Sequence, residues 1–301
     1  MIVFATSDKG GTGRSVTCAN IAYRRALTDD DVAYVDFDFG SPTAAVVFEV
    51  IAAMRGVDNQ GVHSYLQGDS DEPTRLDVWS QTDREALRGG PANAGRLCLV
   101  PGDRGGGEFA VRKDVVDRCV RLLTQLHEEF DVTIVDLSAG RSYAIDIALQ
   151  AAVRLESQGI VSRWLVFHRW TRQHIVATAG LVHGERGILS TGQNRGHDRE
   201  ALAGRIRYVR AAVPDIGSPH EGALAEWLRV CDEDLHELAA KNRLGRTVRL
   251  GTVPLDPVLQ WREQLITDAD VANPPVANRR TAEAFRDLAD ALTDDRRWET
   301  L

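Results

Sequence analysis

A basic, glycine-rich run stands near the start of the chain, with the sequence Lys9-Gly10-Gly11-Thr12-Gly13-Arg14-Ser15. Its glycines allow the backbone to curl with N–H groups pointing inward, which is how such loops bind anions. The basic side chains supply positive charge, and the Ser15 hydroxyl is placed to ligate Mg²⁺. The run therefore predicts a phosphate-binding loop whose binding residues are Gly10, Gly11, Thr12, Gly13, Arg14, Ser15 and Val16.

Carboxylates follow two apolar runs farther along the chain. Asp36 and Asp38 lie at the end of the run 32–37, and two carboxylates two residues apart on a strand point to the same side. Such a pair suits a metal ion and a reactive water beside phosphate groups, although a solvated, Asp-rich turn would have the same sequence. Asp136 ends the apolar run 132–135, a position from which a carboxylate supports Mg²⁺ next to a phosphate loop.

Short apolar runs alternate with helical periodicity along the chain. The expected strands are residues 2–6, 32–37, 97–100, 132–135, 164–167, 206–209 and 246–253. The expected helices are residues 15–27, 115–130, 175–182, 223–241 and 281–292, with a polar loop or partial helix at 187–204. Since the strands are apolar on both faces, we expect an α/β fold with a doubly wound, mostly parallel sheet flanked by helices. We expect a single domain over residues 1–301, with a variable region of loops and short helices at about 51–95.

The glycine-rich run resembles the deviant Walker A sequence K-G-G-x-G-K-[ST] of the ParA/MinD family of P-loop ATPases. Lys9 matches the signature lysine of that family, which implies a catalytic contact across a nucleotide-sandwich homodimer to the phosphates of the partner subunit. Arg14 stands where the usual P-loop lysine is expected. A planar guanidinium is bulkier than an ammonium group, so this exchange bears directly on the phosphate site.

The acidic residues carry the same resemblance. Residues 35–40 are similar to the D-F-D-I-G segment of MinD proteins. This match implies that Asp38 orients the attacking water, a catalytic role, and that Asp36 supports either the magnesium shell or the switch I segment. Residues 131–140 resemble a Walker B strand that leads into a switch segment, which implies a magnesium role for Asp136 together with Ser15.

A further resemblance lies near the end of the chain. Residues 251–256 are similar to the strand and loop that pack against adenine in the family. The match adds Pro254 and Asp256 to the implied nucleotide site.

Several positions depart from the family pattern. Asp8 would repel phosphate unless its carboxylate pairs with Lys9 or Arg14. Residues 208–210 lack the Asn that often reads the nucleotide base in the family. Two interpretations of Arg14 remain open: composition bias with nucleotide binding retained, or a site impaired in binding or hydrolysis.

The composition of the chain affects how strongly Lys9 and Arg14 bear on the activity of the site. The 301 residues include 33 arginines but only three lysines, Lys9, Lys113 and Lys241. This bias weakens Arg14 as evidence of an inactive site, and it makes the lysine kept at position 9 more significant. A net charge of −8 argues against electrostatic coating of nucleic acid. Four scattered cysteines without a Cys-x-x-Cys motif favour a reducing, cytoplasmic setting, and the sequence predicts no membrane segment.

The resemblance implies a cytoplasmic nucleotide-dependent switch that binds ATP and Mg²⁺. Such a switch would form a homodimer on the nucleotide, engage a protein partner, and act as a weak ATPase with slow or impaired hydrolysis. Two alternatives stay open: a hydrolysis-deficient P-loop scaffold subunit of a larger assembly and, less favoured, a DNA-partitioning ATPase. Residues 163–174, rich in Trp, Arg and His, are expected to form a contact surface for a partner or a second subunit, in preference to a metal site.

Overall fold

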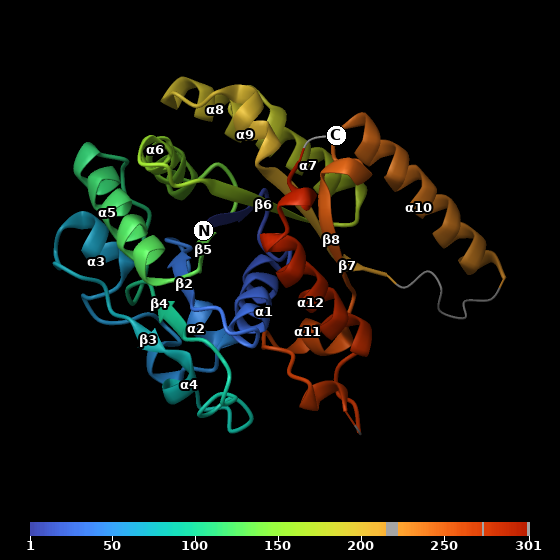
Figure 1. The fold of residues 1–301 in the computed structure, drawn as a ribbon. Helices are drawn as coiled ribbons and strands as arrows, with labels where there is room; N and C mark the ends of the chain where they lie inside the picture. The colour runs from blue at the N-terminus through green and yellow to red at the C-terminus, as the bar shows by residue number, and fades with distance from the viewer. Residues whose placement is uncertain (215–221, 273, 300–301) are drawn as a thin grey trace.

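An eight-stranded sheet forms the centre of the molecule (Figure 1). The structure, a computed structural model, describes residues 1–214, 222–272 and 274–299. The strands are β1 Ile2–Ser7, β2 Val32–Phe37, β3 Leu76–Asp77, β4 Leu97–Val100, β5 Val132–Leu137, β6 Ser162–Arg169, β7 Ile206–Val213 and β8 Arg249–Pro254. Their spatial order is β3-β4-β2-β5-β1-β6-β7-β8, and every neighbouring pair is parallel except β3–β4. The predicted doubly wound, mostly parallel sheet is confirmed.

Helices cover both faces of the sheet (Figure 1). One face carries α3 Val62–Gln67, α5 Lys113–Glu129, α6 Tyr143–Ser157, α7 Arg172–His183, α8 Ile188–Arg195, α9 Arg199–Gly204 and α10 Ala223–Lys241. The other face carries α1 Arg14–Ala26, α2 Ala44–Val47, α4 Val78–Gln81 and α12 Arg279–Thr293. The remaining helices are α11 Pro257–Trp261 and the 3₁₀ turns η1 Ile51–Ala53, η2 Arg246–Val248, η3 Ala269–Val271 and η4 Asp295–Arg297. Within the described residues, none of the helices combines the length and the apolar composition that crossing a bilayer requires.

The central strands are buried on both faces. Every residue of β1, β2 and β5 is buried. Along β1, Ile2 and Phe4 pack with the α5 and α6 side of the core, whereas Val3 and Ala5 pack with the α1 and α12 side. Successive side chains of a strand point to opposite faces, so a strand covered on both sides needs an uninterrupted apolar sequence.

Some elements were not predicted. The sequence pattern predicts neither α6 nor the two-residue strand β3. It predicts a polar loop or partial helix at residues 187–204, where the structure has α8 and α9. Helix α6 buries eight of its residues, four of them alanines. Small, evenly spread apolar residues give little periodic contrast, which is why this helix is hard to detect from sequence.

The carboxyl ends of three neighbouring strands converge on one place. Strand β1 lies between β5 and β6, and β2 pairs with β5 so that Asp36 is opposite Asp136. The glycine-rich run follows β1 directly. In open α/β sheets ligands bind outside the carboxyl ends of the strands, near the point where the strand order reverses. The fold therefore places the predicted phosphate loop and the predicted carboxylates together.

Candidate functional site

The glycine-rich run forms the turn between β1 and α1. Gly11 and Gly13 have φ values of 70° and 75°, a left-handed backbone that residues with a side chain rarely adopt. Gly13 caps the N-terminus of α1, and its carbonyl accepts a hydrogen bond from the Thr17 N–H at 2.9 Å. No acidic residue lies in the first turn of α1, so the positive end of the helix dipole is unopposed there. This turn has the geometry of an anion-binding loop.

A cleft of 610 Å³ opens beside this loop. Its walls come from the glycine-rich turn, the segment after β2, the end of β7 and the segment after β8. The predicted site residues that line it are Gly10, Gly11, Thr12, Gly13, Arg14, Ser15, Val16, Asp38, Pro254 and Asp256. This volume is within the usual range for small-molecule sites, whereas Lys9, Asp36 and Asp136 lie outside the lining.

The Arg14 side chain turns inward and lies between two carboxylates. Its Nη2 donates to Asp38 Oδ2 at 3.0 Å, and its Nε donates to Asp136 Oδ1. The side chains of Arg14 and Asp136 are 6% and 1% exposed, and that of Asp38 is 27% exposed. Although burial alone would lower the pKa of Arg14, Asp136 and Asp38 hold that pKa above its usual value. A permanent cation is thus fixed at the floor of the cleft.

The Asp136 carboxylate uses both of its oxygens within the protein. Oδ1 accepts from Arg14, and Oδ2 accepts from the Tyr34 hydroxyl at 2.7 Å. Burial raises the pKa of Tyr34, and Asp136 raises it further, so the phenol stays protonated and keeps donating. Asp136 is therefore a buried carboxylate with one charged and one neutral partner.

Asp36 lies deeper than Asp38, although the two residues are only two positions apart. Its side chain accepts hydrogen bonds from the N–H groups of Asp38 at 3.1 Å and Ala44 at 3.0 Å. Burial raises the pKa of Asp36 to about 8; the N–H of Ala44 opposes this rise, and the nearby Asp136 adds to it. Of the two roles that the resemblance implies for Asp36, this placement favours holding the segment after β2 over supporting the magnesium shell.

The predicted magnesium ligands can be tested against this arrangement. Arg14 Nη2 lies 3.5 Å from Ser15 Oγ, so one guanidinium contacts Ser15, Asp38 and Asp136. Mg²⁺ requires several oxygen ligands in octahedral geometry, and here the space between these oxygens holds a cation already. As arranged, the residues do not fit Mg²⁺, because a divalent ion would have to displace the guanidinium from both carboxylates.

The segment after β5 is tied to the ends of β1 and β2. Ser138 Oγ accepts from the Phe39 N–H at 2.9 Å and donates to the Phe37 carbonyl at 3.2 Å. Gly140, with φ of 76°, donates its N–H to the Ser7 carbonyl at 2.7 Å. A movement of the segment that carries Asp38 would therefore be transmitted to residues 138–140.

The two charged residues at the start of the loop lie apart from Arg14. Asp8 forms an ion pair with Arg141, at 3.7 Å between Oδ1 and Nη1, and not with Lys9 or Arg14. Burial lowers the pKa of His174, and the charges of Arg169 and Lys9 lower it further, which places Lys9 near α7. The Lys9 side chain forms no ion pair within the described part of the chain. Its contact with a second subunit stays a prediction.

Asp256 organises the segment that closes the cleft. Its carboxylate is 2% exposed. It accepts from the Val258 N–H at 3.1 Å, the Asn278 N–H at 2.8 Å and the Thr281 hydroxyl at 2.7 Å. The residue lines the cleft, but its charged group is turned toward α11 and α12, so it positions the wall.

Several residues that line the cleft are not predicted from the sequence. Arg169, at the end of β6, lines the cleft as a second cation, and Thr43, Gln260 and Glu263 add polar groups. From the sequence, Arg169 is expected only as part of a contact surface. Its signal was its place at the carboxyl end of a buried strand, where ligands bind. No comparable signal marks Gln260 or Glu263.

The end of β7 shapes the cleft in a way that the sequence did not reveal. The register with β8 shifts between Arg210 and Val213, and Ala212 there has a φ of 52°. Ala211 and Ala212 line the cleft, while Arg210 is buried outside its lining. Bulges of this kind redirect side chains next to binding sites. None of residues 208–210, where the family resemblance implied a base-reading residue, lines the cleft, and the small side chains of Ala211 and Ala212 form its wall there.

Most of the aromatic and histidine side chains in residues 163–174 are in the core. Trp164 and His168 are 0% exposed and Trp170 is 5% exposed. Burial lowers the pKa of His168 to about 4, so this imidazole is neutral. The described residues contain no group of three or more metal-binding side chains. The expected contact surface is thus reduced to exposed residues such as Arg172, which pairs with Asp234 at 3.0 Å.

Solved structures with the same arrangement of elements include MinD and plasmid partition proteins. The MinD of the MinC:MinD complex from Aquifex aeolicus is 14% identical with a TM-score of 0.60, over 97% of this chain and 95% of that one. A putative plasmid partition protein from Borrelia burgdorferi bound to AMPPNP is 12% identical with a TM-score of 0.60, over 98% of both chains. MinD from Pyrococcus horikoshii complexed with Mg-ADP is 16% identical with a TM-score of 0.56, over 98% of this chain and 96% of that one.

These matches define the class of fold. The chain has the fold of the MinD and ParA P-loop ATPases over almost its whole length. Sequence comparisons find no matching family model and no matching curated protein. Function must therefore be argued from the site itself.

Proposed function

We propose that the chain is a ParA/MinD-like nucleotide-dependent switch that binds ATP in the P-loop cleft and turns it over slowly. The loop amides, the end of α1 and the cations Arg14 and Arg169 all converge on one cleft. Proteins with the same fold have been seen with AMPPNP and with Mg-ADP. The converging positive groups support a phosphate-bearing ligand, and the wall formed by Pro254 leaves room for the rest of the nucleotide.

The observation that carries the proposal is the ion pair between Arg14 and Asp38. An attacking water needs a carboxylate free to accept its hydrogen bond. Asp38 instead accepts from the Arg14 guanidinium at 3.0 Å. Turnover then requires this pair to open, which adds a step that a lysine at position 14 would ease, because an ammonium group is smaller than the planar guanidinium that bridges Asp38 and Asp136 here.

The same ion pair supplies the two states of the switch. Phosphate oxygens entering the cleft compete with Asp38 for Arg14, and release of Asp38 frees the segment that runs on to Thr43. That segment is bonded to residue 138 through Phe39. Replacement of Asp38 by phosphate at Arg14 is in this way coupled to the segment that follows β2 and to the segment that follows β5.

Dimerisation and partner binding are part of the proposal. Lys9 is half-buried beside the cleft and forms no ion pair with a described residue of its own chain, so its charge is available to the phosphates of a second copy. A protein partner would then recognise the closed pair. Self-association on ATP is the first property to measure for this part of the proposal.

Steady-state ATP turnover tests the proposed function. We expect slow turnover by the native protein, an increase of about tenfold or more in Arg14→Lys because the opening step is eased, and loss of turnover in Asp38→Ala. Arg24→Lys is the matched control, since Arg24 is a buried arginine of the same helix that pairs with Asp268 outside the cleft. Native turnover equal to or above that of Arg14→Lys would contradict the proposal, and ATP binding without turnover in either protein would favour the scaffold alternative.

A further inference from the structure

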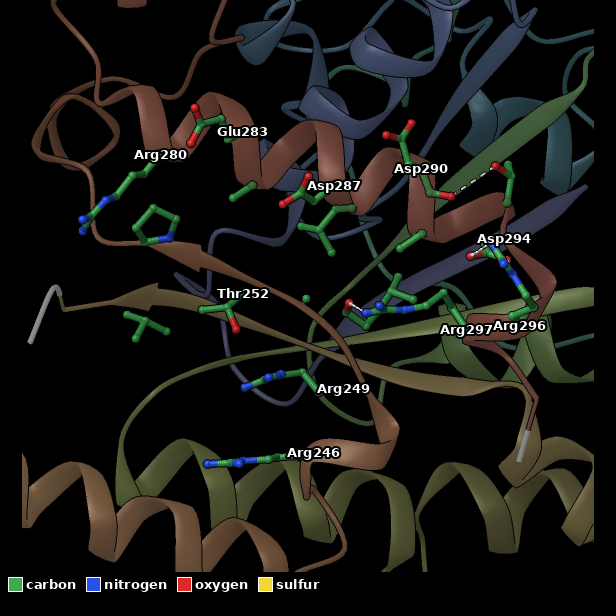
Figure 2. Close-up of a pocket in the computed structure, with 18 of the residues that line it drawn as sticks. Arg246, Arg249, Thr252, Arg280, Glu283, Asp287, Asp290, Asp294, Arg296 and Arg297 are labelled. Carbon is green, nitrogen blue, oxygen red and sulfur yellow. Dashed lines mark hydrogen bonds and ion pairs between the residues drawn. The ribbon is translucent and has the colours of Figure 1, made fainter. Parts of the chain in front are cut away.

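Three arginines gather at the edge of the sheet, away from the P-loop. Arg210 is on β7, Arg249 begins β8 and Arg246 is in η2 just before it. We call these three residues the arginine cluster. Figure 2 shows Arg246 and Arg249 extending side by side, in the same direction, into the open space below β8. Both line a groove of 1380 Å³ that shares only Pro254 with the P-loop cleft.

A bulge in β8 brings these side chains to one face. Arg249 is opposite Tyr208 and Thr252 is opposite Arg210, with one extra residue accommodated on β8 after Arg249. Tyr208 and Arg210 are two residues apart on β7, so their partners also share a face. In a regular strand Arg249 and Thr252 would point to opposite faces. The bulge therefore assembles two cations and a hydroxyl that the sequence spacing alone would separate.

The arginine cluster has no carboxylate partner within the described residues. None of Arg210, Arg246 and Arg249 forms an ion pair there, and Arg210 Nε and Nη2 are buried without a hydrogen-bond partner. Arg210 is only 3% exposed, with its guanidinium 3.6 Å from the centre of the Trp170 ring. Buried polar groups are almost always satisfied in folded proteins. A buried Arg210 guanidinium without a hydrogen-bond partner among the described residues therefore points to a group that binds there.

The acidic groups nearby do not fill this role. Asp232 on α10 accepts from Trp170 Nε1 at 2.7 Å and lies 3.5 Å from His236 Nε2. The acids of α12 lie on the other face of β8, because a Cβ on Gly251 would meet Leu288 of α12 at 2.6 Å. Figure 2 shows Glu283, Asp287 and Asp290 along α12 on that side, across β8 from Arg246 and Arg249.

The arrangement is electrostatically unfavourable in the ligand-free protein. Burial lowers the pKa of Arg210 to about 10, and the charges of Arg249 and Arg246 contribute to this, against the opposing charge of Asp232. Burial also lowers the pKa of Arg249, with Arg246 and Arg297 adding to the shift. Positions where like charges are kept together at a cost in stability are characteristic of binding sites.

We propose that the arginine cluster binds a phosphate-class oxyanion at the end of the groove lined by Arg246, Thr247, Arg249 and Thr252. Guanidinium groups match the oxygens of a phosphate in geometry as well as charge, and the two threonine hydroxyls add neutral donors. Arg210, behind Arg249, adds a third positive charge. The oxyanion is either free phosphate or a phosphoryl group on a side chain of a partner protein, and the two sources share this chemistry.

The test compares native protein with Arg249→Gln in phosphate and in chloride of equal ionic strength. We expect 10 mM inorganic phosphate to raise the Tm of the native protein by roughly 2 °C more than that of Arg249→Gln. In calorimetric titrations we expect the dissociation constant of phosphate at the arginine cluster to be at least about tenfold higher in Arg249→Gln than in the native protein. Phosphate binding at the P-loop is common to both proteins, so the difference between them is independent of the proposed ATP switch.

The ligand-free proteins give a second readout. In chloride, Arg249→Gln should melt at the same temperature as native protein or higher, because the substitution relieves repulsion, whereas loss of a merely structural arginine would lower the Tm. Arg296→Gln is the matched control: Arg296 lines the same groove but pairs with Asp294, and its phosphate response should equal the native one. Arg246→Gln, at an exposed position, repeats the test if Arg249→Gln does not fold.

A comparison of two ligands identifies whether the oxyanion is free phosphate or a phosphoryl group on a partner protein. A phosphoserine peptide that binds about tenfold more tightly than inorganic phosphate would assign the site to a partner protein, and equal affinity would assign it to free phosphate. A phosphate response in both Arg249→Gln and Arg246→Gln within twofold of native would overturn the proposal, as would a fall in the Tm of these two variants in chloride.

Discussion

Arg14→Ala is expected to lower the free energy of unfolding by about 3–5 kcal/mol, because it removes one partner of a buried ion pair. Asp136 is 1% exposed, so its charge would stay in the interior with only the Tyr34 hydroxyl as partner. Asp38, 27% exposed, can turn toward water and contributes less. Urea unfolding of both proteins at pH 7, with equal m-values, measures the difference.

Two companion variants separate the ion pair from packing. Arg14→Ala combined with Asp136→Asn removes both charges, so it should be more stable than Arg14→Ala alone by at least about 1 kcal/mol. Arg14→Lys keeps the charge and should fall between native protein and Arg14→Ala. A loss below about 1 kcal/mol in Arg14→Ala would show that the buried pair does not form in solution.

The stability of the native protein should fall between pH 4 and pH 8 because of Asp36. In the unfolded chain the pKa of Asp36 is near 3.8, the usual value for an aspartate, whereas burial raises this pKa to about 8 in the folded protein. Between these values the folded state holds one more proton, so stability decreases as pH rises and levels off above about 8. A shift of this size corresponds to a loss on the order of 5 kcal/mol across the window.

Asp36→Asn isolates this contribution. At pH 5 the variant should be less stable than native protein by roughly 1–3 kcal/mol, because its side chain accepts fewer of the N–H bonds from Asp38 and Ala44. At pH 9 the variant should equal or exceed native protein, since it has no carboxylate to ionise. Urea titrations at pH 5, 7 and 9 provide the comparison, and parallel pH profiles for the two proteins would contradict the role assigned to Asp36.

The fold and the place of the site could be predicted from sequence. Glycine runs and doubly apolar strands have strong local signatures, and these predict the phosphate loop after β1 and the carboxylates at the ends of β2 and β5 at one edge of the sheet. Asp36 and Asp38 show the limit of prediction from sequence. Both have the same local sequence signal, but strand pairing and the segment up to Ala44 bury Asp36 and leave Asp38 at the cleft.

The partners of charged residues could not be predicted either, because they too depend on contacts between distant parts of the chain. From the sequence, Lys9 and Arg14 are the cations that could neutralise Asp8, but its carboxylate pairs with Arg141, because the fold, and not the chain, decides which charges meet. Strand register has the same effect on Arg169 and Arg210. Arg169 lines the cleft, whereas Arg210 lies outside that lining and packs against Trp170, and the bulges between β7 and β8 that shape both surfaces have no signal in the sequence.

Calorimetric titration of the native protein with ATP, first in EDTA and then in millimolar Mg²⁺, tests the central claim most directly. The claim is that Arg14 provides the cation at the floor of this P-loop cleft, between Asp38 and Asp136. We predict binding in both conditions, with dissociation constants within about threefold of each other, and a dependence on Mg²⁺ that appears only in Arg14→Lys. Binding that is at least about tenfold tighter with Mg²⁺ in the native protein, or no binding in either condition, would contradict the account.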